Sequence, residues 1–86
     1  MDYERESGML KALGHPVRLK IVEKLMVSKE CNVNRMVNQL GIPQSTVSQH
    51  LGILKSRGVI ISRKEGVKTC YKVAHKRIGK IIETLR

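Results

Sequence analysis

The sequence contains no phenylalanine, no tryptophan and only two tyrosines. A hydrophobic core must therefore be built from aliphatic side chains and methionine. A chain of 86 residues also buries only a modest share of its surface when it folds alone. We expect a single domain over residues 1–86, with part of its stability supplied by a partner subunit.

Long apolar runs are also lacking. No segment approaches the roughly 20 consecutive apolar residues that a membrane-spanning helix needs, and the chain does not open with a signal peptide. The two cysteines, Cys31 and Cys70, are too few for a disulfide scaffold. These absences predict a cytoplasmic protein without a membrane partner.

Acidic residues are scarce, since 7 Asp and Glu stand against 17 Lys and Arg and leave a net charge of +10. A field of that sign attracts polyanions, and nucleic acid is the main candidate. The sequence holds no Ser-His-Asp set, no nucleotide-binding glycine loop and no paired-carboxylate arrangement. We therefore expect neither an enzyme nor a bound cofactor.

Residues 33–58 predict two short helices joined by a tight turn. The apolar residues of the first helix fall at helical spacing and are Val33, Met36, Val37 and Leu40. Gly41 supplies the left-handed position that closes such a helix, and Pro43 suits the start of the next. The second helix is expected to bury Val47, Leu51 and Leu54 and to stop at Gly58. This pattern is typical of a helix-turn-helix.

The other face of the second helix carries no charge, which is unusual on the surface of so charged a chain. Its residues are Gln44, Ser45, Thr46, Ser48 and Gln49. Amide and hydroxyl groups read the donor and acceptor pattern of base edges, and methyl groups contact thymine. We expect this face to lie in the major groove of double-stranded DNA. The alternative is an ordinary helix pair with a polar surface.

The remaining segments predict three further helices and a hairpin. An acidic first turn begins a helix that ends at Gly14, His15-Pro16 opens a second helix, and residues 74–86 form the last one. After Gly58 the spacing of apolar residues changes from that of a helix to that of β-strands, and a turn at Glu65-Gly66 separates the two predicted strands. Residues 31–33 predict a short strand. The last helix carries an aliphatic stripe, and such a stripe usually pairs with another surface.

This order of elements is that of a winged helix, and two segments, Leu10–Leu25 and Leu40–Gly66, resemble the ArsR/SmtB family of bacterial transcription regulators. The most specific parts are His15-Pro16-x-Arg18-Leu19 and Ser45-Thr46-x-Ser48-x-His50-Leu51. The resemblance implies an α+β fold that is mostly α, namely a winged helix-turn-helix with a two-stranded wing and a C-terminal dimerisation helix. It also implies a homodimer built from the first and last helices, with recognition helices in successive major grooves.

The sequence and the resemblance together predict a homodimeric, sequence-specific DNA-binding transcriptional regulator, most simply a repressor that occludes a promoter. The residues expected at DNA are Gln44, Ser45, Thr46, Ser48, Gln49, His50, Lys55, Arg57, Arg63, Lys64 and Lys68. His50 is expected either to contact phosphate or to brace the turn. The residues expected at the dimer interface are Met9, Leu10, Leu13, Ile78, Ile81, Ile82 and Leu85.

Many members of that family sense metals, but this sequence departs from them at the ligand positions. Asn32 and Asn34 stand where the resemblance implies paired cysteines, and the last helix offers only His75 and Glu83. A zinc site needs about four nitrogen, sulfur or oxygen ligands. We therefore predict no metal site.

The thiols allow a second function. Strand parity predicts that Cys70 is exposed between Lys68 and Lys72, whose charges favour the thiolate, and that Cys31 faces inward. Opposite faces disfavour an intrachain disulfide. One alternative function is a thiol-redox-switched DNA-binding sensor that uses Cys70 or Cys31. Another is a winged-helix module that binds protein or RNA, although RNA duplexes hide the groove that such a helix would read.

Overall fold

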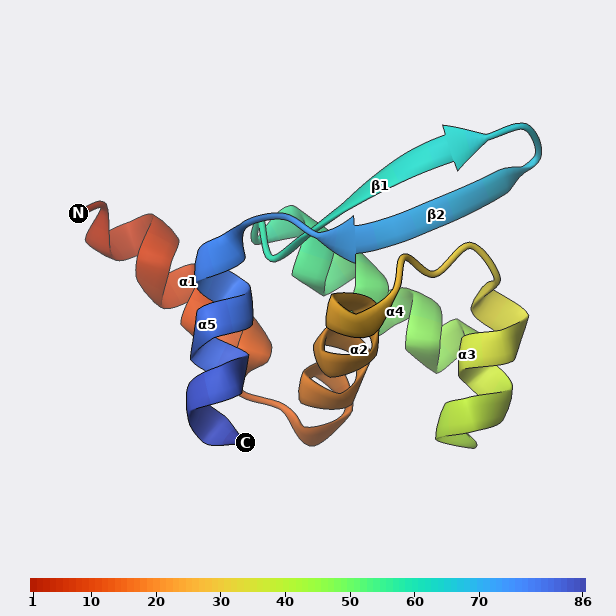
Figure 1. Ribbon diagram of the computed structural model, residues 1–86, viewed down its shortest axis with the longest axis horizontal. Helices are drawn as coiled ribbons and strands as arrows, with labels where there is room; N and C mark the ends of the chain where they lie inside the picture. The colour runs from red at the N-terminus through yellow and green to blue at the C-terminus, as the bar shows by residue number, and fades with distance from the viewer.

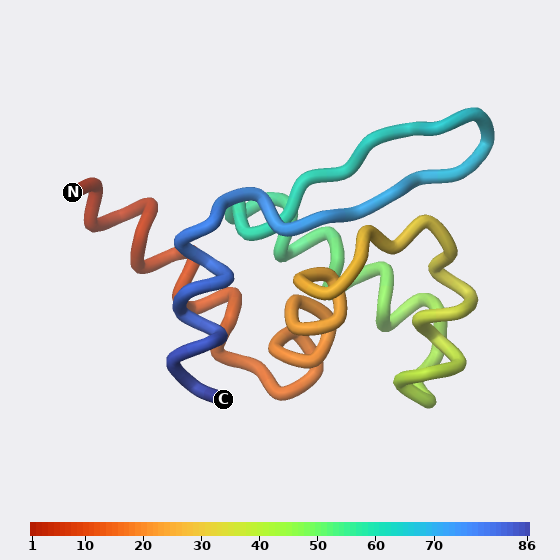
Figure 2. Tube along the Cα trace, viewed as in Figure 1, coloured from red at the N-terminus to blue at the C-terminus, as the bar shows by residue number.

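The computed structural model describes all 86 residues and confirms a mostly helical chain with a two-stranded hairpin. Its elements are α1 (Tyr3–Leu13), α2 (Pro16–Val27), α3 (Val33–Leu40), α4 (Gln44–Ser56), β1 (Ile60–Glu65), β2 (Lys68–Val73) and α5 (Lys76–Leu85). In Figure 1, α1 and α5 lie at one end of the molecule, while α3 and the tip of the hairpin lie at the other. Both chain termini lie at the α1/α5 end (Figure 2). None of the helices is long and apolar enough to span a membrane.

The turn between α3 and α4 forms where the sequence predicted it. The Asn32 side chain accepts a hydrogen bond from the backbone N–H of Arg35 at 3.2 Å and caps the start of α3. Gly41 has a φ of 67°, the left-handed conformation that ends the helix. Pro43 then stands at the N-cap of α4, which begins at Gln44. The predicted helix-turn-helix is therefore confirmed.

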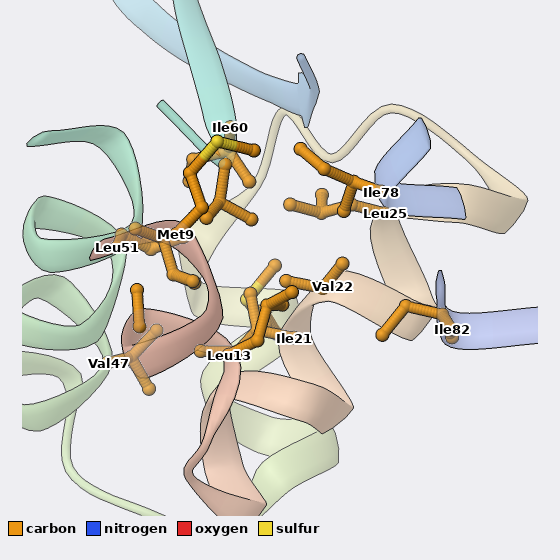
Figure 3. Packing of buried hydrophobic residues seen from close by; sticks show 14 residues of the cluster. Met9, Leu13, Ile21, Val22, Leu25, Val47, Leu51, Ile60, Ile78 and Ile82 are labelled. Atoms are coloured by element: carbon orange, nitrogen blue, oxygen red, sulfur yellow. The ribbon is translucent and has the colours of Figure 1, made fainter. Parts of the chain in front are cut away.

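The core is aliphatic and draws on every helix, as the lack of Phe and Trp requires (Figure 3). Its members are Met9, Ala12, Leu13, Ile21, Val22, Leu25, Met36, Val47, Leu51, Leu54, Val59, Ile60, Ile78 and Ile82. Burying one such side chain contributes roughly 1.5–3 kcal/mol. Because α4 supplies three of these residues, its opposite face is held at the surface.

Most of the residues predicted to face a partner subunit are instead buried in the core of the single protomer. Met9, Leu13, Ile78 and Ile82 are at most 4% exposed within the single protomer. Of the other predicted interface residues, Leu10 and Leu85 are 55% and 68% exposed, and Ile81 is half-buried. The interface prediction therefore narrows to these last three residues.

The hairpin differs from the prediction in small ways. Glu65 pairs with Lys68, so the turn residues are Gly66 and Val67, one position later than expected. Gly66 takes a φ of 67° there, which suits glycine in a tight hairpin turn. The short strand predicted at residues 31–33 is instead a single antiparallel bridge between Glu30 and Tyr71, because α3 already begins at Val33.

Candidate nucleic-acid interface

The recognition face of α4 lies on the surface as predicted. Burial of Val47, Leu51 and Leu54 turns the opposite side of the helix outward. Gln44, Ser45, Ser48 and Gln49 are exposed, and Thr46 is half-buried. The helix carries no charged side chain before Lys55, so its exposed first two turns present only amides and hydroxyls.

The wing adds positive charge beside this face. Arg63, Lys64 and Lys68 are all exposed. Glu65 Oε1 lies 2.7 Å from Arg63 Nη2 and 3.0 Å from Lys29 Nζ. These two hydrogen bonds, that of Arg63 first, hold the pKa of the Glu65 carboxyl below its ordinary value.

Two of the wing cations remain unneutralised. Lys64 and Lys68 have no acidic partner within ion-pair distance. No Asp or Glu occurs anywhere from Cys31 to Lys64, so the helix-turn-helix itself carries no negative side chain. On the surface formed by α4 and the wing, the single carboxylate, that of Glu65, is paired with Arg63 and Lys29, so the net charge of this surface is positive, which suits a polyanion.

The two cations predicted near α4 lie at its far end. Lys55 is exposed in the last turn of the helix. The Arg57 side chain lies against α1, with Nη1 3.4 Å from the position that a Cβ on Gly8 would occupy. With a rise of 1.5 Å per residue, Arg57 stands about 20 Å along the helix from Gln44. The structure therefore does not bring Arg57 to the recognition face.

His50 braces α4 against the helices behind it. Arg18 Nε donates to His50 Nδ1 at 3.2 Å, and Arg18 Nη1 donates to the Ala12 carbonyl at 3.4 Å. The ring of His50 also lies 4.6 Å from that of His15, whose Nδ1 accepts from the backbone N–H of Val17 at the start of α2. The two motif segments singled out in the sequence therefore meet in space, and these contacts support the bracing role predicted for His50.

Arg18 is a residue that the sequence analysis missed as part of this site. It stands in the His-Pro-x-Arg motif, 32 positions before His50, and no local period connects the two. Because Nδ1 of His50 accepts a hydrogen bond from a cation, the imidazole must be neutral. Burial, followed by the charges of His15 and Arg18, lowers the pKa of His50.

Acidification is therefore expected to destabilise the fold through His50. A histidine whose pKa is lowered on folding stabilises the fold fully above its unfolded pKa of about 6.5, and that stabilisation is lost as the pH falls through the lowered folded value. Urea unfolding between pH 5 and pH 8 measures this effect. His50→Gln keeps a neutral hydrogen-bonding side chain, so its stability should fall less on acidification than that of the wild type. Equal slopes in both proteins would contradict the assignment.

The structure corrects the prediction for both cysteines. Cys70 is 2% exposed, not a solvent-facing thiol, and it forms a disulfide with Cys31. The reason is the register, because the Glu30–Tyr71 bridge sets Cys31 directly opposite Cys70. Directly opposed residues of antiparallel neighbours project to the same face. The alternation of side chains along one strand does not show which residue of a neighbouring segment lies opposite.

The implied metal positions do not fit a metal. Asn32 and Asn34 are exposed amides, which substitute poorly for thiolates on a soft ion. Cys31, Cys70 and Glu65 do present ligand atoms within 4.8 Å of one another, a grouping that the sequence analysis did not predict. Their sulfurs are joined in the disulfide, and the metal ligand is the thiolate.

A helix-turn-helix followed by a two-stranded wing is the arrangement of the winged-helix class of nucleic-acid-binding proteins. Residues 15–62 match the profile of the arsR family of bacterial regulatory proteins. The chain is 40% identical over 86 residues to the transcriptional repressor PagR of Bacillus anthracis, covering 99% of this chain and 85% of that protein. It is 37% identical over 81 residues to the HTH-type transcriptional regulator MJ1325 of Methanocaldococcus jannaschii, covering 94% and 91%. The chain belongs to the arsR family.

Solved structures agree with this assignment. The crystal structure of PagR from Bacillus anthracis superposes with a TM-score of 0.88 and 34% identity, covering 100% of this chain and 98% of that one. The homodimeric winged helix-turn-helix DNA-binding domain of Mb0332 from Mycobacterium bovis gives a TM-score of 0.86 and 25% identity, covering 96% and 76%. The predictions of the winged-helix fold and of the family are confirmed.

Proposed function

We propose that this chain is a homodimeric, sequence-specific transcriptional repressor that acts in the cytoplasm by occluding promoter DNA. Its 86 residues serve as one DNA-binding domain with no catalytic role. The observation that carries the proposal is the exposed, uncharged face of α4 beside a wing whose Lys64 and Lys68 have no acidic partner. The repressor PagR and the homodimeric Mb0332 domain support repression and dimerisation.

The recognition side chains stand in two rows along α4. Gln44 and Ser48 are four residues apart, as are Ser45 and Gln49, and this spacing places each pair on one face of a helix. Gln44 and Gln49 are separated by about 7.5 Å along the axis, roughly two base-pair steps. Each glutamine amide matches adenine in the major groove, while the serines accept or donate at either base.

The cations take a separate role. Lys64, Lys68 and Lys55 are exposed and serve phosphates, which position the protein without reading sequence. The charge of Arg63 is partly neutralised by Glu65, whose carboxylate it contacts at 2.7 Å. Arg63 therefore attracts phosphate less strongly than the unpaired lysines do. We therefore assign sequence choice to α4 and most of the sequence-independent affinity to the lysines.

Replacing either glutamine is expected to relax sequence discrimination. Gln44→Ala or Gln49→Ala should cost about 1–3 kcal/mol on the preferred DNA site and almost nothing on random DNA. Anisotropy titrations against both duplexes measure the difference. Gln39→Ala is the matched control, because Gln39 is also exposed but lies on α3. Equal losses on both duplexes would show that α4 does not read bases.

A further inference from the structure

We propose that Cys31 and Cys70 form a reversible thiol–disulfide site, oxidised by hydroperoxides, whose disulfide fixes the wing to the helix-turn-helix and strengthens DNA binding. The DNA-binding part of this inference rests on the proposed function. The sulfur chemistry rests on the local backbone geometry alone.

The backbone places the two cysteines together independently of the sulfur bond. Glu30 N–H donates to the Tyr71 carbonyl at 3.1 Å, and Tyr71 N–H donates to the Glu30 carbonyl at 2.8 Å. The next pair along this ladder is Cys31 and Cys70, with their Cα atoms 4.0 Å apart. Non-hydrogen-bonded antiparallel pairs approach most closely, at about 4.5 Å. The reduced chain therefore already holds both thiols within reach of each other.

The two sulfurs differ in access. Cys31 is half-buried and lines a surface pocket of about 400 Å³ together with Gln44 and Lys68. Cys70 is 2% exposed and lines a smaller pocket with Lys29, Arg63 and Lys72. Glu65 presents a carboxylate oxygen within 4.8 Å of both sulfurs, so exposure rather than charge separates the two. Cys31 is thus the sulfur that an oxidant reaches, and Cys70 is the resolving thiol.

The chemistry balances with a hydroperoxide as oxidant. The Cys31 thiolate attacks the terminal oxygen of the peroxide, the O–O bond breaks, and an alcohol or water leaves after taking up a proton. The Cys70 thiolate then attacks Sγ of the resulting Cys31 sulfenic acid, forms the S–S bond and expels hydroxide, which is protonated to water. Two thiols lose two electrons to the peroxide. A dithiol reductant reverses the change by exchange.

The position of the bond couples it to the DNA-binding surface. The bond spans 39 positions and closes a loop that contains α3, α4, β1 and the hairpin turn. That loop includes every side chain assigned above to bases or phosphates. With the bond cut, the wing is held to the α2–α3 connection by the Glu30–Tyr71 hydrogen bonds and the exposed Lys29–Glu65 ion pair.

The oxidised form is therefore the form preorganised for DNA. Its wing is tied by the disulfide to the α2–α3 connection in the arrangement described above. Without the bond the wing keeps the Glu30–Tyr71 hydrogen bonds but is held less rigidly, and any motion that it gains must be lost again on binding, which weakens the complex. We expect reduction to lower DNA affinity by about tenfold, since the loss of wing order is comparable to fixing two or three long side chains.

The experiment compares the full-length protein after hydrogen peroxide with the same protein after dithiothreitol. Alkylation followed by mass spectrometry counts free thiols, thermal unfolding reports the cross-link, and anisotropy against one duplex reports DNA affinity. Peroxide should remove both free thiols, raise Tm by more than about 10 °C and tighten binding about tenfold. Cys31→Ser, given the same peroxide, is the matched control for oxidation of methionine, and it should show none of these changes. Cys70→Ala repeats the control at the buried position.

Two results would overturn the inference. Free thiols that survive peroxide would exclude the site itself, and equal DNA affinity of the oxidised and reduced wild type would exclude the coupling. Failure of the proposed function looks different. In that case neither the oxidised nor the reduced protein binds DNA, and the proposed effect of the disulfide on DNA binding is excluded as well. Mass spectrometry would still show whether peroxide forms the disulfide.

Discussion

Raising the salt concentration from 50 to 200 mM is expected to weaken DNA binding by about 10³ to 10⁵. Lys55, Arg63, Lys64 and Lys68 are exposed in each protomer, so a dimer brings two copies of these four cations to phosphates. Each neutralised phosphate releases condensed counterions, and the logarithm of the binding constant falls with that of the salt concentration by about 0.9 per phosphate. Anisotropy titrations at several salt concentrations give this slope.

The lysines provide the control for this measurement. Lys64→Ala removes one phosphate contact per protomer and should reduce the slope by about two for the dimer. Lys20→Ala removes the same charge from an exposed position on α2, outside the helix-turn-helix and the wing. An unchanged slope in Lys64→Ala, or an equal reduction in both variants, would show that the wing does not serve phosphates.

Separating the two subunits is expected to have an effect of similar size. Leu10 and Leu85 are large apolar side chains left 55% and 68% exposed on α1 and α5, two helices that the Arg77–Glu6 ion pair joins. Leu10→Lys combined with Leu85→Lys should give a folded monomer. A monomer engages one half-site, so its affinity for a full site should fall by about 10² to 10⁴ through loss of the linked second contact.

Sedimentation velocity and circular dichroism check this prediction together. Val27→Lys is the matched control, because Val27 is 80% exposed at the end of α2 and should leave both the dimer and DNA binding unchanged. Ile78→Lys with Ile82→Lys serves a different purpose, since both side chains are buried in the protomer core and the variant should unfold. A persistent dimer in the Leu10/Leu85 variant would place the interface elsewhere.

Local patterns in the sequence were sufficient to predict the helix-turn-helix. The i, i+3, i+4 spacing of Val33, Met36 and Val37 and the left-handed position of Gly41 depend only on neighbouring residues, and α3 and its turn formed as expected. The polar face of α4 followed from the burial of Val47 and Leu51 on the other side. Short-range periodicity was therefore sufficient to place the helix-turn-helix and the exposed polar face of α4.

The features that the sequence did not predict depend on contacts between distant segments. Whether Ile78 faces the protomer's own core or a partner depends on where α5 packs, which the apolar period of one helix does not determine. The Arg18–His50 hydrogen bond joins α2 to α4. The disulfide required the register between Glu30 and Tyr71, and strand parity at Cys70 predicted the wrong side because it ignored the neighbouring segment.

Selection of binding sites from a random duplex pool at physiological salt tests the central claim, that α4 reads DNA sequence as part of a dimer. The wild type should enrich two inverted half-sites centred 10–10.5 base pairs apart, about 34–36 Å, as two recognition helices in successive major grooves require. Gln44→Ala with Gln49→Ala should lose the preference at specific positions of each half-site while still retaining DNA. No enrichment by the wild type, or an unchanged motif from the double variant, would contradict the account.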